Sequence, residues 1–371
     1  MRTLILLIWF TIAIIFISAE ASVISVQPTQ SIQRAIDSAR TDDRIEIYNG
    51  TYLENINVTK RLTIVGIGRP VIDAGWIDNA ITLSVDGITI DGFNATNSSN
   101  AGISILSNYN IVTDNFAIGN DFCGIYLEKS DNNSLISNTL INNGVIGIFL
   151  DKSSENNTIR RNRAVGNGDS GIGLKESYTN YIIENSVFSN GNDGIELYKC
   201  LNNFIKGNLA SWNKDGICLE LGSENNTISE NNASFNLIDG ILIRSSQGNS
   251  VINNSISRNK VGIFLEASQK NVIAGNNVSF NGNGIYLNYY SINNTLVMND
   301  LHDNSNYGAY DESCTNQWYN NSIRGKIGNH YSNFDESSEG CKDADGDNIC
   351  DFAYSIPGGS SFDRYPMTHQ T

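Results

Sequence analysis

The residues best suited to bind a metal lie in one acidic stretch near the C-terminus, KDADGDNICDF. Its four aspartates are grouped around a glycine: Asp343, Asp345, Asp347 and Asp351. Alternating carboxylates on a glycine-containing turn can converge their oxygens on one hard cation, as in calcium loops. The stretch departs from the EF-hand pattern, because it lacks the glutamate at position 12 and has glycine at position 4. We expect a structural Ca²⁺ site here, with a solvated acidic loop as the alternative.

The six cysteines fall into two groups. Three lie among central repeats and three near the C-terminus, and no pair is spaced as CxxC, which disfavours a zinc site. Disulfides are allowed in an exported protein. The sequence predicts one loop disulfide, Cys341–Cys350, and leaves any other pairing open.

A second set of residues that could bind a ligand recurs in the motif G-I-x-L. Aromatic and carboxylate residues occupy the second and fourth positions after the glycine, and seven of them form a predicted glycan-binding face: Tyr126, Phe149, Glu196, Tyr198, Glu220, Phe264 and Tyr286. Aromatic rings can stack on sugars, and carboxylates accept hydrogen bonds from hydroxyl groups. The alternative is structural, because exposed strand positions favour aromatic residues that pack in ladders.

The candidates for catalysis are Glu196 and Glu220, which occupy adjacent repeats. Rung spacing and strand rise place them roughly 8 Å apart, within the ~6.5–9.5 Å range of inverting glycoside hydrolysis. Many carboxylates in a repeat protein share that separation, so no catalytic residue is assigned. The Gly-His-Gly, Arg-Ile-Lys and Asp-Pro-His motifs of known polysaccharide enzymes are absent from the sequence, which weighs against an enzyme.

These residues are positioned by an internal repeat. Its glycines recur every 22 to 24 residues: Gly102, Gly124, Gly147, Gly171, Gly194, Gly216, Gly240, Gly262, Gly284 and Gly308. A fixed period of this length indicates a solenoid. Apolar residues alternate after each glycine, and two further short apolar runs follow, so each repeat holds three strands and no helix. The sequence predicts an all-β chain folded as a single right-handed parallel β-helix.

Asparagines punctuate every repeat. Nine residues after the glycine the chain has Asn133, Asn156, Asn180, Asn203, Asn225, Asn249, Asn271 and Asn293. A further column is Asn143, Asn167, Asn190, Asn213, Asn236, Asn259, Asn281 and Asn304. Asparagine tolerates the left-handed backbone of tight corners, and its amide can bond along a stack of identical residues. We therefore expect corner ladders, with ligand contact as the alternative.

The two ends of the chain differ from the repeats. Residues 1–21 combine one arginine, an apolar run and Ala-Glu-Ala, which predicts a cleaved secretory signal. Residues 22–100 hold irregular coils and the stretch SIQRAIDSA, which predicts a helix that caps the open end. Regular repeats follow over 101–323, and residues 324–371 form a cap with the acidic loop. No second apolar run follows the signal, so no membrane span is expected in the mature chain.

The charge of the chain limits its partners. The formal net charge is −15, although charged residues make up only 17 % of the sequence. An acidic chain without a run of Lys and Arg disfavours nucleic acid and anionic membranes. It suits cations or neutral polymers better.

The segments SIQRAIDSA, DRIEIYNGTYLENINVTKRLTIVG and ITLSVDGITIDGF, followed by the G-I-x-L coils, resemble the pectin-lyase-like β-helix superfamily. Within it, the chain most resembles the NosD-like repeat proteins of the carbohydrate-binding and sugar-hydrolase (CASH) type. The C-terminal segment GNHYSNF resembles the end of many such proteins, but His330-Tyr331 replace their usual aromatic pair. The resemblance spans residues 24–367 and is specific for the fold, which hosts several functions.

The expected function is that of an exported, extracellular or cell-surface protein that binds polysaccharide or supports the envelope. The rival is a carbohydrate-active lyase, hydrolase or epimerase, and a third possibility is a structural spacer. A NosD-type role in copper-site maturation is the least favoured. Copper prefers His, Met and Cys thiolate, and the three histidines and three methionines form no cluster.

Overall fold

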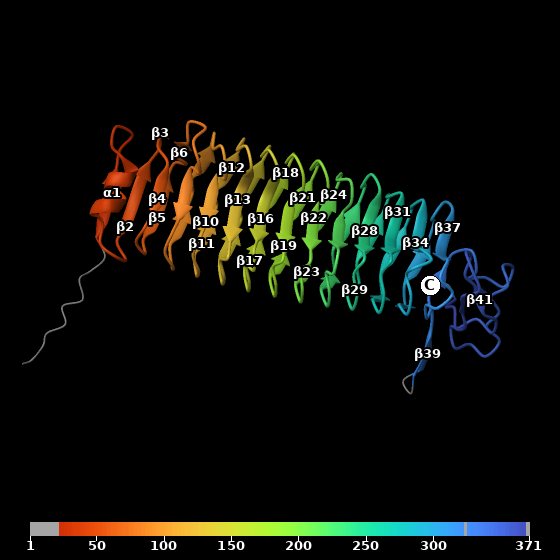
Figure 1. Ribbon diagram of the computed structural model, residues 1–371. Coiled ribbons are helices and arrows are strands. Elements are labelled where there is room, and N and C mark those ends of the chain that lie inside the picture. Colours follow the sequence, from red (N-terminus) through yellow and green to blue (C-terminus); the bar gives the residue numbers. More distant parts are fainter. Residues whose placement is uncertain (1–21, 323–324, 369–371) are drawn as a thin grey trace, which may run out of the picture.

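The computed structural model describes residues 22–322 and 325–368, and the predicted signal segment 1–21 lies outside them. The chain winds into an elongated stack of coils, each of which adds one strand to each of three parallel sheets (Figure 1). This is the predicted all-β, right-handed parallel β-helix. No helix in the described residues is long and apolar enough to cross a membrane.

The sheets, named A, B and C, have 13, 13 and 12 strands. Sheet A contains β1 (Val23–Val26), β2 (Arg44–Tyr48), β5 (Thr63–Ile67), β8 (Thr89–Asp91), β11 (Ile111–Thr113), β14 (Ser134–Ile136), β17 (Thr158–Arg160), β20 (Tyr181–Ile183), β23 (Phe204–Lys206), β26 (Thr227–Ser229), β29 (Ser250–Ile252), β32 (Val272–Ala274) and β35 (Thr295–Val297). Sheet B contains β3 (Thr51–Leu53), β6 (Val71–Asp73), β9 (Asn94–Thr96), β12 (Phe116–Ile118), β15 (Thr139–Ile141), β18 (Arg163–Val165), β21 (Ser186–Phe188), β24 (Leu209–Ser211), β27 (Asn232–Ser234), β30 (Ser255–Ser257), β33 (Asn277–Ser279), β36 (Asp300–His302) and β40 (His330–Tyr331). Sheet C contains β4 (Ile56–Val58), β7 (Ile81–Leu83), β10 (Ile103–Ile105), β13 (Cys123–Glu128), β16 (Ile146–Asp151), β19 (Ile172–Lys175), β22 (Ile195–Tyr198), β25 (Ile217–Glu220), β28 (Asp239–Arg244), β31 (Val261–Glu266), β34 (Asn283–Leu287) and β37 (Tyr307–Asp311).

The G-I-x-L motif forms the strands of sheet C. Successive coils pair in parallel with equivalent residues opposite one another, as Ile125 pairs with Ile148 and Leu127 with Leu150. The Ile and Leu of each motif point inward and are fully buried. Because the same residue type recurs at each rung, the interior is one continuous column of aliphatic side chains.

Helix α1 (Ile32–Ser38) lies at the N-terminal end of the stack, against strands of the first coils (Figure 1). The Ser31 side chain accepts a hydrogen bond from the backbone N–H of Arg34, which is the usual role of an N-cap serine. The apolar face of the helix is buried through Ile32, Ala35 and Ile36. This face covers apolar residues that the first coil would otherwise expose.

The other end is irregular (Figure 1). It includes the antiparallel pairs β38 (Asn320–Ser322) with β39 (Gly325–Ile327), and β41 (Tyr354–Ser355) with β42 (Phe362–Asp363). Trp318 and Tyr331 are fully buried beneath this segment. Cys341 and Cys350 form a disulfide in it.

Three corners of each coil are built on buried asparagine ladders. They are Asn110, Asn133, Asn157, Asn180, Asn203, Asn226, Asn249, Asn271 and Asn294; then Asn115, Asn138, Asn162, Asn185, Asn208, Asn231, Asn254, Asn276 and Asn299; and then Asn120, Asn143, Asn167, Asn190, Asn213, Asn236, Asn259 and Asn281. In a typical rung, the backbone N–H and the Nδ2 of Asn180 both donate to Asn203 Oδ1, at 2.8 and 3.1 Å. The Nδ2 of Asn180 also donates to the Ser154 carbonyl. Ladders therefore account for these buried asparagines.

One predicted ladder was wrong in three coils. Asn156, Asn225 and Asn293 are exposed and have φ near +55°, whereas the buried ladder residue is the next asparagine in each case. These coils carry one extra residue between the sheet C strand and the corner, which shifts the count from the glycine. The residue with the left-handed backbone therefore directly precedes the asparagine whose side-chain amide is stacked in the ladder. The left-handed position accepts other residues, including Thr179 and Lys270.

The corner between sheets C and A also carries a serine ladder, which sequence reasoning missed. Its members are Ser107, Ser130, Ser154, Ser177, Ser223, Ser246, Ser268 and Ser291, with Cys200 in place of one serine. The backbone N–H of each typically donates to the next hydroxyl, as Ser130 does to Ser154 Oγ at 3.2 Å. Because the period of this column is the same as that of the asparagines, an alignment of the repeats could have revealed it.

Candidate functional site

The residues that could bind a ligand or take part in a reaction lie on the outer face of sheet C. At each motif glycine the backbone approaches the next coil so closely that a side chain is excluded: a Cβ on Gly194 would lie 2.6 Å from the Gly216 carbonyl oxygen. Around this glycine, three positions of each coil face outward. We name them column 1 (the residue before the glycine), column 2 (two after it) and column 3 (four after it).

The seven predicted glycan-binding residues lie on this face, in columns 2 and 3, and are half-buried. They form two separate aromatic groups. Tyr126 and Phe149 pack at 5.7 Å between ring centroids at one end, and Phe264 meets Tyr286 edge-to-face at 5.3 Å at the other. Tyr286 also stacks face to face on Tyr310. Because stacked rings turn their faces toward each other, much of the aromatic surface is used for packing within a ladder and is not open to a ligand.

The ladder is interrupted at Gly173, the column 2 residue of β19. Its neighbours in the register are Phe149 on one side and Glu196 on the other. The missing side chain leaves a pocket of about 270 Å³. The pocket is lined by Ile146, Phe149, Asp169, Gly173, Leu174, Lys175, Glu196 and Tyr198. An aromatic wall therefore faces a carboxylate wall across one vacant rung.

Glu196 is the best placed acid of this pocket. The Ser170 hydroxyl donates to Glu196 Oε2 at 2.9 Å. Burial raises the pKa of Glu196, the hydrogen bond from Ser170 opposes that change, and the charges of Asp169 and Glu220 add to it. Glu196 is thus a carboxyl group that retains its proton to higher pH than an ordinary glutamate does.

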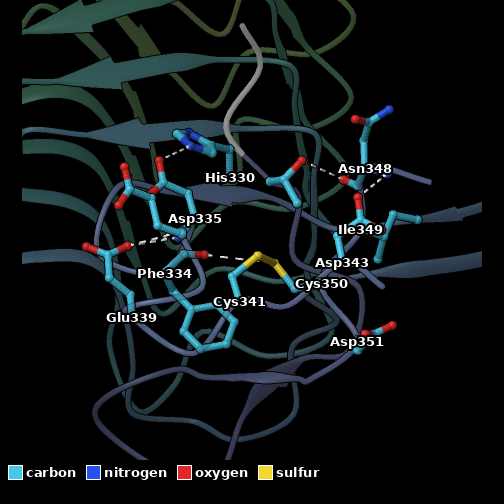
Figure 2. Close-up of a disulfide and its surroundings, with 12 residues drawn as sticks. His330, Phe334, Asp335, Glu339, Cys341, Asp343, Asn348, Ile349, Cys350 and Asp351 are labelled. Carbon is cyan, nitrogen blue, oxygen red and sulfur yellow. Dashed lines mark hydrogen bonds and ion pairs between the residues drawn. A yellow bond between two sulfur atoms is a disulfide. The ribbon is translucent and has the colours of Figure 1, made fainter. Parts of the chain in front are cut away.

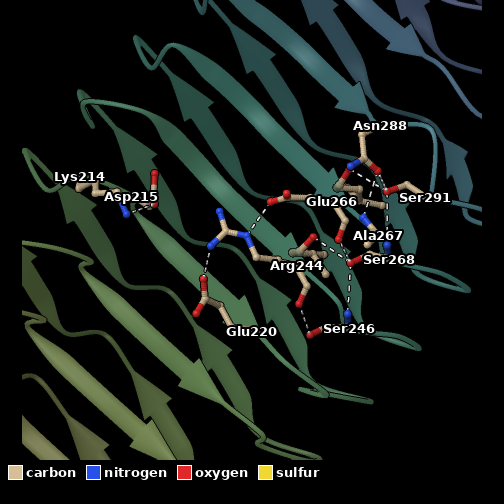
Figure 3. Close-up of polar contacts among 12 residues, drawn as sticks. Lys214, Asp215, Glu220, Arg244, Ser246, Glu266, Ala267, Ser268, Asn288 and Ser291 are labelled. Atoms are coloured by element: carbon tan, nitrogen blue, oxygen red, sulfur yellow. Dashed lines mark hydrogen bonds and ion pairs between the residues drawn. The ribbon is translucent and has the colours of Figure 1, made fainter.

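The second predicted acid, Glu220, lies outside the pocket. Its carboxylate pairs with Arg244 at 2.6 Å, and Arg244 pairs with Glu266 at the same distance (Figure 3). Column 3 therefore alternates in charge over these three rungs. The structure does not bring Glu196 and Glu220 together in one pocket, because the side chain of Glu220 is held toward Arg244.

Column 1 contains three successive aspartates that sequence reasoning missed: Asp193, Asp215 and Asp239. They are 3 %, 2 % and 3 % exposed. Asp215 accepts a hydrogen bond from the backbone N–H of Asp239 at 2.8 Å and lies 3.4 Å from Lys214 Nζ (Figure 3). The Oδ1 atoms of Asp193 and Asp239 have no hydrogen-bond partner among the described residues.

This arrangement changes how Asp193 and Asp239 titrate. Burial, together with the charge of Asp215, raises the pKa of Asp193 to about 8 and that of Asp239 to about 7. A buried carboxyl oxygen without a hydrogen-bond partner is rare in proteins and lowers the stability of the folded state. The signal was present in the sequence, since D-G-I occurs in three consecutive repeats, but strict alternation along the strand would place the residue before the glycine inside.

The acidic loop lies in the C-terminal segment beside the disulfide (Figure 2). Asp343, Asp345 and Asp347 each offer a carboxylate oxygen within 4.8 Å of the others. Asp343 also accepts backbone N–H groups of Gly346 and Asn348. Asp351 stands apart from this group, and its Oδ2 accepts a hydrogen bond from the Ala344 N–H.

The fold of the chain is similar to that of several solved proteins. The Dettilon tailspike protein gp208 aligns with a TM-score of 0.63 and 17 % identity, over 76 % of this chain and 68 % of the tailspike. The A-module of a mannuronan C-5 epimerase from Azotobacter vinelandii aligns with a TM-score of 0.57 and 16 % identity, over 78 % and 92 %. An alginate lyase from Paenibacillus sp. str. FPU-7 aligns with a TM-score of 0.55 and 15 % identity, over 63 % and 94 %. At these identities the likeness concerns the fold alone.

A search of curated proteins finds no match to this chain. One family model does match, over residues 35–220 and 180–336, which is most of the chain and takes in every coil that carries the outer face of sheet C. Its description is "Periplasmic copper-binding protein (NosD)". The period, the parallel sheets and this match agree, and the chain belongs to the NosD family.

Proposed function

We propose that the protein is an exported carbohydrate-binding β-helix that holds a glycan on the outer face of sheet C. The observation that carries this proposal is the pocket at Gly173. One side offers the Phe149 ring, which can pack against the apolar face of a sugar. The other side offers Glu196 and Tyr198, whose oxygens suit sugar hydroxyl groups.

The charge of the surface favours a neutral glycan over a polyuronate. Asp169 and Glu196 line the pocket, and Asp193 of column 1 belongs to the same coil as Glu196. Lys214 and Arg244 nearby are already engaged with carboxylates of the protein, so Lys175 is the one cation of the pocket lining against its two carboxyl groups. A uronate chain would meet repulsion here, whereas hydroxyl groups would find acceptors.

Two comparisons support a carbohydrate-related role. The alginate lyase and the mannuronan C-5 epimerase are, as their names say, enzymes of polysaccharides, and both are similar to this chain in fold. Export agrees with the predicted signal in residues 1–21 and with the word periplasmic in the family description. A structural role in the cell envelope is compatible with the same face, because a long glycan could lie along several coils.

Copper binding does not fit the described residues. Both ring nitrogens of His330 face carboxylates, Asp300 at 2.6 Å and Asp335 at 3.0 Å. Burial alone would lower the pKa of His330, but these hydrogen bonds outweigh it and raise the pKa, which opposes metal binding through the ring. Cys123, Cys200 and Cys218 are buried thiols, and burial raises their pKa values. No step of the proposed function involves copper.

We also propose that the acidic loop binds Ca²⁺ and stabilises the C-terminal segment. The convergence of Asp343, Asp345 and Asp347 supports this role, because hard cations prefer several carboxylate oxygens on one turn. The disulfide at Cys341–Cys350 closes the same loop and would limit the entropy lost on binding.

Affinity electrophoresis tests glycan binding. The protein without residues 1–21 is run through native gels that contain starch, xylan, mannan or inulin, with alginate and polygalacturonate as acidic polymers. We expect at least one neutral polymer, and neither acidic polymer, to retard the protein.

The matched variant is Gly173→Leu, which fills the vacant rung while the Ile146 side chain shifts slightly. We expect this variant to lose retardation. Phe264→Leu, in the same column but outside the pocket, separates a local site from binding along the whole face. Migration that no polymer alters, or full retardation of Gly173→Leu, would contradict the proposed site.

A further inference from the structure

We propose that an exposed aromatic ridge at the corner between sheets B and C docks on the lipid surface of a membrane. The ridge consists of the residue that follows β24, β27, β30 and β33 in four successive coils: Trp212, Phe235, Arg258 and Phe280. None of these residues lines the Gly173 pocket. The inference therefore concerns a second surface and does not depend on the proposed glycan binding.

The ridge is a continuous apolar feature in contact with water. Trp212, Phe235 and Phe280 are 62 %, 40 % and 51 % exposed, and Leu237 at the same corner is 76 % exposed. Trp212 stacks on Phe235 at 4.9 Å between ring centroids. The Arg258 guanidinium lies 5.1 Å from the centroid of Phe235 and 5.5 Å from that of Phe280. Contiguous exposed apolar patches of this kind mark interaction sites.

The fold gives no reason for large side chains at this corner. All four ridge residues have left-handed backbone, with φ between +55° and +60°. Bulky residues are disfavoured in that region. In other coils the same left-handed position holds small or polar residues: Asn142, Gly166, Ser189 and Asp303. The ridge therefore adds exposed apolar surface at a position where the backbone favours other residue types.

The arrangement of the rings favours insertion over stacking on a ligand. The Trp212 and Phe235 rings are parallel within 8°, and Arg258 lies over both Phe235 and Phe280. Because the ring faces are covered by ridge neighbours, little face is left for a sugar, which packs against the face of a ring. Ring edges that project from a corner can enter the boundary between headgroups and acyl chains, where Trp and Phe are favoured.

The local charge suits phosphate headgroups. Lys260 and Arg258 are exposed at this corner. Neither forms an ion pair within the part of the chain that the structure describes, whereas Lys214 pairs with Asp215. The two acids of these corner segments, Asp215 and Asp239, are buried. Cations beside a row of exposed aromatic and aliphatic residues are typical of a surface that lies in a membrane interface.

The net charge of −15 disfavours an anionic membrane as a partner of the chain as a whole. Exposed charges farther than about 8 Å from a surface are largely screened at physiological salt. The charge of the corner itself therefore decides whether it can approach a membrane, and there the exposed charges are positive.

Co-sedimentation with lipid vesicles tests the ridge. The protein is used from residue 22 onward, because the apolar run in residues 1–21 would bind lipid by itself. Vesicles consist of phosphatidylcholine alone or of phosphatidylcholine mixed with phosphatidylglycerol, in buffer of about 0.15 M salt. We expect binding to both, with tighter binding to the mixed vesicles.

Phe235→Asn and Phe280→Asn remove apolar surface without harm to the fold, because asparagine occupies the same backbone position at Asn142. Each should weaken binding to both kinds of vesicle at least 10-fold. The matched control is Phe204→Thr. Phe204 is an exposed, stacked aromatic of sheet A, and Thr227 has its position in the next coil. This control should change binding less than twofold.

Lys260→Gln separates the contribution of charge from that of apolar contact. Loss of one cation near the surface should weaken binding to the mixed vesicles about fivefold. Binding to pure phosphatidylcholine should change less than twofold.

Trp212 provides a readout that a change in stability would not reproduce. In Trp76→Phe, Trp212 is the exposed tryptophan that remains among the described residues, since Trp318 is buried. We expect its emission to move to shorter wavelength on vesicle binding and to be quenched by lipids with brominated acyl chains. In Trp212→Asn, the emission of Trp76 should show neither change.

The outcomes that overturn the inference are distinct. Wild-type protein that binds neither kind of vesicle overturns it, as does unchanged binding by Phe235→Asn and Phe280→Asn. Self-association without vesicles that Phe235→Asn abolishes, measured by sedimentation velocity, would assign the ridge to a second copy of the chain instead. Retardation in glycan gels that Phe235→Asn loses and Gly173→Leu retains would assign it to a glycan.

Discussion

The asparagine ladders and the column 1 aspartates occupy the same repeat, are equally buried and recur at the same spacing. They differ in what their side chains can do along the stack. An amide both donates and accepts, so Asn180, Asn203 and Asn226 bond to one another through successive rungs. An ionised carboxylate only accepts, so ionised aspartates stacked in column 1 would repel one another, and the Oδ1 atoms of Asp193 and Asp239 have no partner in the part of the chain that the structure describes. The ladders serve the fold, whereas the aspartates oppose it.

The largest expected effect on stability comes from replacing a ladder asparagine with aspartate, the residue of column 1. Asn203→Asp would place an acceptor opposite the carbonyls of Ser177 and Leu201, which now receive hydrogen bonds from Nδ2. We expect the free energy of unfolding at pH 7 to fall by about 4 kcal/mol, the cost of an uncompensated buried charge. Chemical denaturation measures it.

The neighbouring Asn202 supplies the control for that variant. It is exposed and lies at the left-handed corner position with φ +58°. Asn202→Asp should change stability by less than about 0.5 kcal/mol. Equal losses in both variants would mean that the ladder bonds do not account for the stability of the coil.

The converse change, from aspartate to asparagine at Asp193 in column 1, should increase the free energy of unfolding. The folded-state pKa of Asp193, about 8, lies above its ordinary value. Its contribution to stability is therefore complete at pH 4 and is lost as the pH rises through 8. Asp193→Asn should flatten this dependence and raise the free energy of unfolding at pH 8.5 by ~3 kcal/mol. Denaturation at several pH values measures the change.

Asp215→Asn is the matched comparison for Asp193→Asn. Asp215 already has Lys214 and the Asp239 N–H as partners, so its replacement should give no gain in stability. A gain as large as that of Asp193→Asn would show that repulsion along the column, and not the unpartnered oxygen, sets the cost.

The acidic loop offers a second comparison with column 1, because its three aspartates converge on one point instead of stacking in successive coils. Saturating Ca²⁺, at about one hundred times its dissociation constant, should stabilise the cap by ~2.7 kcal/mol. Asp343→Asn should abolish this gain, and Asp351→Asn shows whether the fourth predicted ligand contributes. Calorimetric titration and thermal unfolding with Ca²⁺ or chelator measure the effect. Equal unfolding curves with and without Ca²⁺ would refute the site.

The smallest expected effect concerns the alternating charges of column 3. Glu266→Gln removes one of two ion pairs of Arg244 on a partly exposed surface. We expect a loss below ~1 kcal/mol that shrinks further in 1 M salt. A loss of several kcal/mol would mean that this surface network stabilises the coil as strongly as the ladders do.

The candidate site was predictable only in part. The outward direction of Phe149, Glu196 and Tyr198 followed from alternation after the glycine, and that was correct. The pocket did not follow, because it arises from the absence of a side chain at Gly173 between two larger neighbours. Asp193 and its companions were missed because strict alternation would place the residue before the glycine inside, whereas the bend at the glycine places it outside.

The sequence by itself determined the coil, its period and its corners. A repeat near 23 residues with alternating apolar residues can bury its side chains only by stacking on its own copies, and asparagine satisfies itself in such a stack. The tertiary structure decided which asparagine of a pair is buried, where the ladder opens into a pocket and which carboxyls lose their partners. Those properties depend on contacts between coils, which lie about 23 residues apart in the chain and only one rung apart in space.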